Sequence, residues 1–457
     1  MKRPLFFLML LAVLAVTLLG CGGTGSSQPG NASQAAAVFI TGEDAPLPSV
    51  LAFNVTVTGI TLNSNSTSVP ALTSATTIDF ARLLGLRTLV GFNTVQPGTY
   101  TSATINLSAP QISYLDMTTT PPSVGTVSGT LTTSSVTVAF PQPLVVRSSE
   151  LAGLHMEFDL RQSLQLDGTG QVTGVVNPHI DLKPVVASDP DAQITDLRGG
   201  LVSVNVAGSS FVIQRPGGHQ LTIVVNSKTQ FNGSWSLSNL AVPAFVEVDG
   251  TVQADGSILA SGVEVVAATH GFLSGRIVNV NPSSGPAQTI TLLVGEEMPD
   301  IASIPVGFPV TLDVSQVTDF RLCFFDNWFT NILFDNSSMV VGQRIFVGGT
   351  LDANNNFVPQ MISLRRQGVE GDLVQGSVNI ISGNRGSFQI QNNSLMGFLL
   401  NGSLTIQTGN ATLFVNVNGL PGLQSGGAMT LRVHGLMLKD QTTGNPQLWA
   451  GRVRVLP

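Results

Sequence analysis

The chain has 457 residues, of which 43% are hydrophobic, only 10% are charged and just 4 are Lys. Its formal net charge is −7, and an acidic surface repels phosphate backbones, which argues against a nucleic-acid partner. Apolar residues are spread along the whole chain, so the composition excludes wholesale disorder, and the length predicts several domains of about 150 residues each.

The first twenty residues have the composition of an export signal. Residues 1–3 give a short positive start, and residues 5–19 form an apolar run of 15 residues. This run is shorter than the roughly 20 residues that cross a bilayer and is typical of a secretory signal peptide. It ends in Leu18-Leu19-Gly20-Cys21, which resembles the bacterial lipobox. The resemblance implies cleavage before Cys21 and attachment of palmitate-type acyl chains to its thiol; the alternative is a conventional signal with an incidental Cys.

A lipidated Cys21 predicts attachment to a membrane, because two or more acyl chains anchor a protein stably. Gly22 stands where this family carries the Asp of inner-membrane retention, so we expect an exported bacterial lipoprotein of the outer membrane, on its periplasmic face or at the cell surface. Removal of residues 1–20 leaves 18 basic and 27 acidic residues, a formal net charge of −9. Residues 21–36 are rich in Gly, Ser, Gln, Asn and Ala, which predicts a flexible tether.

Residues 37–187 are predicted to form a β-sandwich. Apolar and polar residues alternate with period two in residues 51–58, 101–107 and 135–140, and many of them are β-branched Val and Thr, which favour strands. Residues 79–84 predict one short helix. Many short strands, separated by Gly, Pro and Asn, indicate a sandwich.

Four short runs in this region carry a further pattern. They are Ile78-Asp79-Phe80, Pro97-Gly98-Thr99-Tyr100, Glu157-Phe158-Asp159-Leu160 and Pro178-His179-Ile180. Together they resemble a family of bacterial lipoprotein domains of unknown function that follow a lipobox and a short linker. The resemblance implies a sandwich of the transthyretin or immunoglobulin type. The family has no assigned activity, so it implies no catalytic residues.

Three similar units follow, after a linker predicted at Asp189-Pro190-Asp191. In each unit a Thr follows an apolar strand at the same distance along the sequence, and these Thr residues are separated by 89 and 94 positions. They are Thr229, Thr318 and Thr412. A block with a central Gly recurs downstream as Val248-Asp-Gly-Thr251, Val347-Gly-Gly-Thr350 and, more loosely, Val433-His-Gly435. Such repetition predicts three related domains. Their predicted ranges are 195–268, 271–367 and 369–457.

Each unit offers five short strands with its longest connection between the third and the fourth, where an OB-type barrel places its helix. Five short strands gain by closing into a barrel, because closure removes exposed edges. The units resemble another bacterial family of unknown function with this small-barrel form. We therefore predict an all-β protein: an N-terminal β-sandwich followed by three five-stranded OB-like barrel repeats. In the first unit the strands are expected near 201–206, 211–214, 221–225, 245–252 and 258–266.

The long connection of the second unit, residues 321–338, is rich in aromatic side chains. Exposed aromatics can form a platform for a sugar or the centre of a protein interface. The alternative is that they pack into the barrel as core, as Phe334 in the same connection can also do. The candidate binding-loop residues are Phe324, Phe325, Trp328 and Phe329.

Signatures of catalysis and of cofactor or metal binding were not found. The sequence has no Gly-Lys dipeptide, no Gly-x-Ser-x-Gly elbow and no His-Glu-x-x-His motif. The five His are scattered over four predicted domains, so we predict no metal site and no cofactor. Cys323 lies in an apolar run, which predicts a buried thiol rather than a reactive one.

Acidic residues give weaker patterns. Glu157 and Asp159 share one face of a predicted strand, so they either share a site or form a polar face. Glu296 and Glu297, close to Gly and Pro, predict a loop. Residues 352–356 superficially resemble a calcium loop, but they lack its Gly and its final Glu and predict a turn.

These observations favour a lipid-anchored envelope protein with a noncatalytic binding or scaffolding role. Its expected partners are the membrane, through lipidated Cys21, and an envelope protein or a glycan. One alternative is a carbohydrate- or matrix-binding module, and another is a hydrolase with an unrecognised site.

Overall fold

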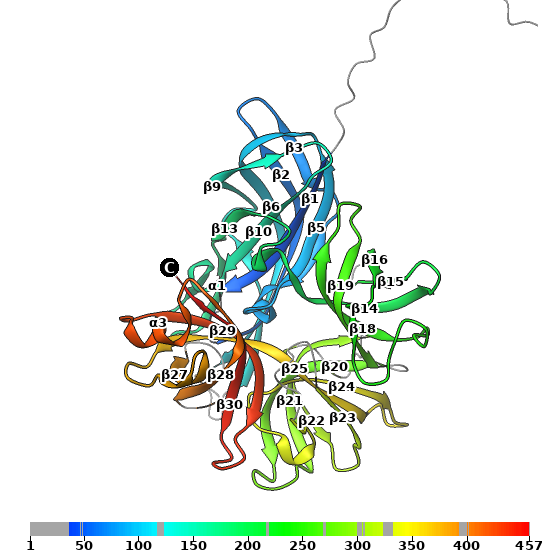
Figure 1. Ribbon diagram of the computed structural model, residues 1–457, viewed down its shortest axis with the longest axis vertical. Coiled ribbons are helices and arrows are strands. Elements are labelled where there is room, and N and C mark those ends of the chain that lie inside the picture. Colours follow the sequence, from blue (N-terminus) through cyan, green and yellow to red (C-terminus); the bar gives the residue numbers. More distant parts are fainter. Residues whose placement is uncertain are drawn as a thin grey trace, which may run out of the picture. The chain divides into compact units, whose positions relative to one another are not determined.

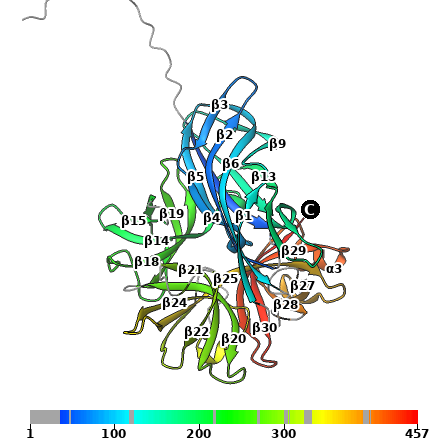
Figure 2. The ribbon, with the colours of Figure 1, turned by 180° about the vertical axis from the view of Figure 1, so that it is seen from behind.

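Strands are the main regular structure of the described chain and helices are few and short, which confirms the all-β prediction (Figures 1 and 2). None of the helices among the described residues is long and apolar enough to span a membrane. The structure is a computed structural model that describes residues 36–45, 47, 49–116, 123–215, 219–267, 271–298, 304, 307–322, 332–392, 400 and 402–456.

The N-terminal part is a sandwich, and its strands have the period-two burial that the sequence predicts. One sheet contains, in order, β13 (Ile180–Val185), β10 (Leu151–Asp159), β1 (Ala36–Ala45) and β5 (Thr88–Val95). The other contains β3 (Ser68–Leu72), β2 (Val50–Asn63), β6 (Gly98–Asp116) and β7 (Ser123–Ser128), with β4 (Thr76–Asp79) beside β2 and β9 (Ser135–Val146) beside β6. A small third sheet contains β11 (Leu164–Leu166), β12 (Val172–Val176) and β8 (Thr130–Leu131). The short helix expected at 79–84 is the 3-10 helix η1 (Phe80–Leu83), and α1 (Leu160–Ser163) follows β10.

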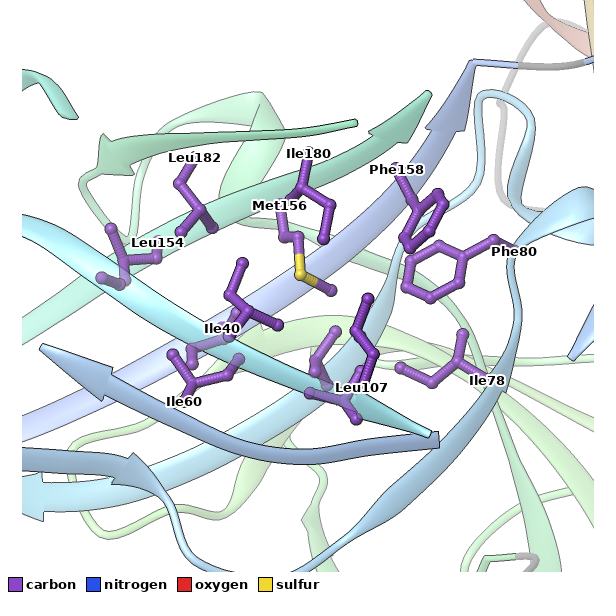
Figure 3. Packing of buried hydrophobic residues seen from close by; sticks show 14 of the residues in the cluster. Ile40, Ile60, Ile78, Phe80, Leu107, Leu154, Met156, Phe158, Ile180 and Leu182 are labelled. Atoms are coloured by element: carbon purple, nitrogen blue, oxygen red, sulfur yellow. The ribbon is translucent and has the colours of Figure 1, made fainter. Parts of the chain in front are cut away.

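Side chains from both sheets form the core of the sandwich. Ile40 and Met156 come from one sheet and Leu107 from the other, and Figure 3 shows them gathered in one space. The ring of Phe158 lies 5.1 Å from that of Phe80, measured between centroids. Burial of each such side chain contributes about 1.5–3 kcal/mol, so the alternating apolar residues favour the packing of the two sheets against each other.

Residues 194–267 form a closed ring of strands around a second apolar core, which also includes Phe39, Leu89 and Val185 of the sandwich. The strands are β14 (Ile194–Asn205), β15 (Ser210–Gln214), β16 (Gln220–Val224), β17 (Gln230–Phe231), β18 (Phe245–Val252) and β19 (Ile258–Ala267). Around the ring, β14 pairs with β15, β15 with β16, β16 with β19, β19 with β18, and β18 with β14. The pair β16–β19 is parallel.

The next segment continues the same pattern of pairing. Its strands are β20 (Phe272–Asn281), β21 (Thr289–Met298), β22 (Pro309–Asp313), β23 (Asp319–Leu322), β24 (Arg344–Leu351) and β25 (Phe357–Leu373). They follow the order β22-β21-β20-β24-β25, and β23 pairs in parallel with β25. Glu296 and Glu297 lie inside β21, so the predicted loop is wrong: the ladder with β20 continues through both residues.

The last segment shares β25 with the one before it. Its other elements are β26 (Asn379–Ser382), β27 (Arg385–Asn392), β28 (Ser403–Val415), α3 (Gly419–Ser425), β29 (Thr430–Lys439) and β30 (Pro446–Val455). The pairs β25–β27, β27–β28, β28–β30, β30–β29 and β29–β25 again close a ring. The junction between the second and third predicted units, near residue 368, falls within the single 17-residue strand β25.

The recurring block with a central Gly has the same local geometry three times. The ladder shifts register at Gly250 in β18, at Gly349 in β24 and at Gly435 in β29. A Cβ at any of the three would collide with a carbonyl oxygen of the facing strand. A bulge with so close a backbone approach requires Gly, which explains the repeated residue.

Candidate functional site

Charged residues are few in this chain, yet many of the described ones are buried together where the sandwich and the three following segments meet. Removing an ionised group from water costs several kcal/mol unless counter-charges and hydrogen bonds replace the water. We call this set the ionic junction. Its members are Glu43, Arg87, Asp191, Asp196, Arg198, Glu247, Glu264, Arg344, Arg365, Glu370 and Arg432.

The junction is built on equivalent positions of the three C-terminal segments. In the first segment Arg198, Glu247 and Glu264 face one another across β14, β18 and β19. Apolar residues on either side of each point into the ring, so these three side chains point away from it. The equivalent rows are Ser274, Phe346 and Ser363 in the second segment and Glu370, Arg432 and Arg454 in the third.

The first row carries two carboxylates directly opposite each other, Glu247 and Glu264. Like charges in this position repel. Arg365 of β25, whose side chain is 0% exposed, forms ion pairs with both. Arg198 donates from Nε to Glu247 at 3.0 Å. Burial is the largest influence on the Glu247 carboxyl and raises its pKa, even though Arg365 and Arg198 act in the opposite direction.

Asp196 and Phe346 hold the arginines of this region together. Asp196 is fully buried and pairs with Arg198 at 2.7 Å, with Arg344 at 3.2 Å and with Arg82. Burial opposes ionisation of Asp196, but the arginines outweigh it and lower its pKa. The ring of Phe346 lies 4.5 Å from the guanidinium carbon of Arg198, an attractive cation–π arrangement.

The third row has the opposite charge pattern and docks on the sandwich. Arg432 contacts Glu43 and Glu157 at 2.8 Å and Glu370 at 3.1 Å. Glu43 also lies 3.6 Å from Arg87. Burial raises the pKa of Glu43, but Arg432 and Arg87 more than compensate and lower it to about 2.

Two further groups complete this side of the junction. Asp191 lies in the 3-10 helix η2 (Pro190–Ala192). Its carboxylate forms ion pairs with Lys183 at 2.5 Å, with Arg452 at 2.8 Å and also with Arg454. These cations lower the pKa of Asp191 against the effect of burial. His155 lies 3.6 Å from Glu43, but burial lowers its pKa to about 4, so it is neutral at pH 7.

The predicted site residues lie partly outside the described residues. Cys21, Phe324, Phe325, Trp328 and Phe329 all do, as does Cys323, so the predictions made for them stay predictions. Phe334 from the same connection is described and packs as core, with its ring centroid 5.9 Å from that of Phe320.

The acidic residues singled out in the sequence have different roles in the structure. Glu157 pairs with Arg432, whereas the Asp159 carboxylate accepts from the Gln162 backbone N–H at 2.9 Å and caps α1, so the two do not share one site. Asp352 accepts the backbone N–H groups of Asn354 and Asn356, both at 2.8 Å, which confirms the turn. No group of three His, Cys, Asp or Glu within the described ranges is placed to hold a metal ion.

Sequence reasoning missed the ionic junction, although one signal was available. Arg198 and Glu370 occupy equivalent places in their segments, as do Glu247 and Arg432, beside the recurring Gly block. Arg365 is the residue that links two of the segments.

Two parts of the chain match family models. Residues 36–174 match a domain of unknown function (DUF4382), and residues 199–264 match another (DUF5666). The matches fall on the sandwich and on the ring β14–β19, which confirms the expectation that both regions are domains of unknown function. Neither description names an activity. A search of curated proteins found no match to the chain.

Proposed function

We propose that this protein is a lipid-anchored component of the bacterial envelope with a noncatalytic binding or scaffolding role. The observation that carries the proposal is the ionic junction. Arg365 joins β25 to two carboxylates of the first ring, and Arg432 joins the last ring to the sandwich. These pairs commit the buried acids and bases to structure, so they favour a body that presents fixed surfaces to a partner rather than one that turns over a substrate.

The proposal includes a repeat architecture: we infer that the three C-terminal segments are copies of one OB-type barrel. Two observations support this. The strand pairing of residues 194–267 recurs in the last segment, where the parallel pair β28–β30 takes the place of the parallel pairs β16–β19 and β17–β19. In addition, Thr229 and Thr412 donate from Oγ1 to Ala260 and Ala450 carbonyls, respectively, each at 2.7 Å.

The proposed attachment rests on the lipobox-like sequence before Cys21, and Gly22 favours the outer membrane. The test is intact-mass analysis of protein extracted from membranes with detergent. We expect a chain that starts at Cys21 and carries acyl chains, and we expect a Cys21→Ser variant to be exported but recovered in the soluble fraction. An unmodified mature amino terminus would contradict the anchor.

The binding role requires its own test. We expect cross-linking in living cells to join the anchored protein to one envelope protein or glycan in near-stoichiometric yield. Panels of ester, glycoside and peptide substrates should give no turnover with the purified chain. Turnover that a single substitution abolishes would establish an enzyme and overturn the proposal, whatever the result of the mass analysis.

A further inference from the structure

A small cavity of about 80 Å³ lies beside the ionic junction, between the sandwich and β20 and β21. This is well above the roughly 10–15 Å³ that one water needs, so the cavity has room for a ligand of several heavy atoms. Its polar lining is rich in arginine. The ionisable residues that line it are Arg82, Arg198, Arg276, Arg344 and Glu296.

Among these, Arg276 is the residue for which no counter-charge is found. Arg82, Arg198 and Arg344 all pair with Asp196, and Arg198 pairs with Glu296 as well. Arg276 makes no ion pair within the described part of the chain; the residue as a whole is half-buried, and its Nη1 is shielded from solvent without a hydrogen bond there. Burial lowers its pKa to about 10, so the guanidinium remains charged at pH 7.

The position of Arg276 makes the missing counter-charge more costly. Arg276 in β20 lies directly opposite Arg344 in β24, and like charges in directly opposed positions destabilise a sheet. The one carboxylate that the neighbouring arginines share, Asp196, is divided among three guanidinium groups. Both facts point to an anion that completes the site from outside the chain.

The remaining walls define the class of anion. Leu47, Val50, Leu84 and Leu293 line the cavity and are buried apolar residues. A guanidinium group matches a planar carboxylate through two parallel hydrogen bonds. The carboxylate of Glu296 in the wall disfavours a dianion such as phosphate.

We propose that this cavity binds a small monocarboxylate, with its carboxylate on Arg276 and a short alkyl chain against the leucine-lined wall. This proposal depends neither on the lipid anchor nor on a protein partner. It assigns a ligand to a part of the junction that, in the described chain, has surplus positive charge. The occupant must be small, because pockets for drug-sized ligands measure about 300–1,000 Å³.

The test is isothermal titration of the full mature chain with acetate, butyrate and hexanoate at constant ionic strength, with phosphate and sulfate as further titrants. We expect one site per chain and tighter binding of butyrate than of acetate, because the alkyl chain leaves water. Arg276→Met should weaken butyrate binding at least tenfold. The matched control is Arg147→Met, which removes an arginine whose side chain is 66% exposed and does not line the cavity.

A second variant guards against misfolding of the first. Leu293→Phe fills the apolar wall and leaves every guanidinium in place, so it should also abolish butyrate binding. Wild-type affinity for butyrate in either folded variant would overturn the proposal, as would the absence of carboxylate binding to the wild-type chain. Phosphate or sulfate binding more tightly than butyrate would overturn the assigned class.

Discussion

The first and last rings present rows of opposite charge at the same structural positions. The row in residues 194–267 has one Arg and two Glu, and the row on β25, β29 and β30 has one Glu and two Arg. The surplus acid of the first is neutralised by Arg365 of the neighbouring segment, and the surplus base of the last by Glu43 of the sandwich and Asp191 of η2. The two rings thus have the same strand arrangement but pair with different neighbours, because the three side chains at these positions carry opposite charges.

The largest effect is expected at the last ring, where one arginine serves three carboxylates. Arg432→Met leaves Glu43 and Glu370 buried without their main counter-charge. Removing one partner of a buried ion pair costs about 3–5 kcal/mol, so we expect a loss toward the upper end of this range in the free energy of unfolding. Urea denaturation measures it. A loss below 1 kcal/mol would contradict the role assigned to Arg432.

At the first ring, Arg365→Met removes the counter-charge that Glu247 and Glu264 share, so that the two facing carboxylates repel each other. We expect a loss of about 3 kcal/mol in the free energy of unfolding, again by urea denaturation. The second substitution Glu264→Gln should recover part of this loss, because it removes the repulsion. The exposed pair Arg147–Glu150 gives the matched control, with an expected effect of at most about 1 kcal/mol for Arg147→Met. Equal losses at Arg147 and Arg365 would contradict the comparison.

The sandwich side of the junction should be sensitive to acid. The folded-state pKa of Glu43, about 2, lies below its ordinary value of 4.5, so the stability it contributes is complete above pH 4.5 and is lost as the pH falls toward 2. His155 is also depressed, from 6.5 to about 4, so the unfolded chain binds a proton more readily and stability falls from pH 6.5 to 4. The free energy of unfolding of the wild type should therefore fall more steeply with decreasing pH than that of His155→Gln between pH 6.5 and 4, and the two slopes should agree above pH 6.5 and below pH 4. An identical slope between pH 4 and 6.5 would show that His155 is not buried as a neutral group.

The smallest loss of stability is expected from substitution of the two equivalent threonines. Thr229→Val and Thr412→Val each remove two hydrogen bonds, the one that Oγ1 donates to a carbonyl oxygen and the one that it accepts from a backbone N–H, and each should cost about 1–3 kcal/mol. The loss should be greater for Thr412, because it is buried whereas Thr229 is half-buried. Thermal unfolding of both variants measures the difference. A greater loss at Thr229 would contradict the equivalence of the two sites.

Much of the fold was predictable from local pattern. Period-two alternation located the sandwich strands, and four of the five strands expected in residues 195–268 match to within a residue or two. The first of them begins at Ile194 rather than near residue 201, because buried charged residues such as Asp196 and Arg198 interrupt its apolar pattern. The glycine blocks were visible in the sequence because a bulge with no space for a Cβ leaves only one residue type.

The ionic junction was not predictable in the same way. Arg432 and Glu43 are 389 residues apart, and nothing near either residue indicates the other. Glu157 could be placed on one face of a strand, but its partner comes from a different segment. Charge complementarity is a property of surfaces that meet only after each segment has folded, so it appears only in the assembled structure.

Strand β25 pairs with β24 of the second segment and with β27 and β29 of the last ring, and this limits how the chain can change in evolution. Insertion of a single residue after Arg366 would leave the pairing with β24 intact but rotate every later side chain of β25 to the opposite face of the sheet. Glu370 would then point into the last ring and Val369 out of it. Length variation is therefore expected to be tolerated in the hairpin loops and excluded from residues 357–373, and gain or loss of a whole module should occur on the N-terminal side of β20.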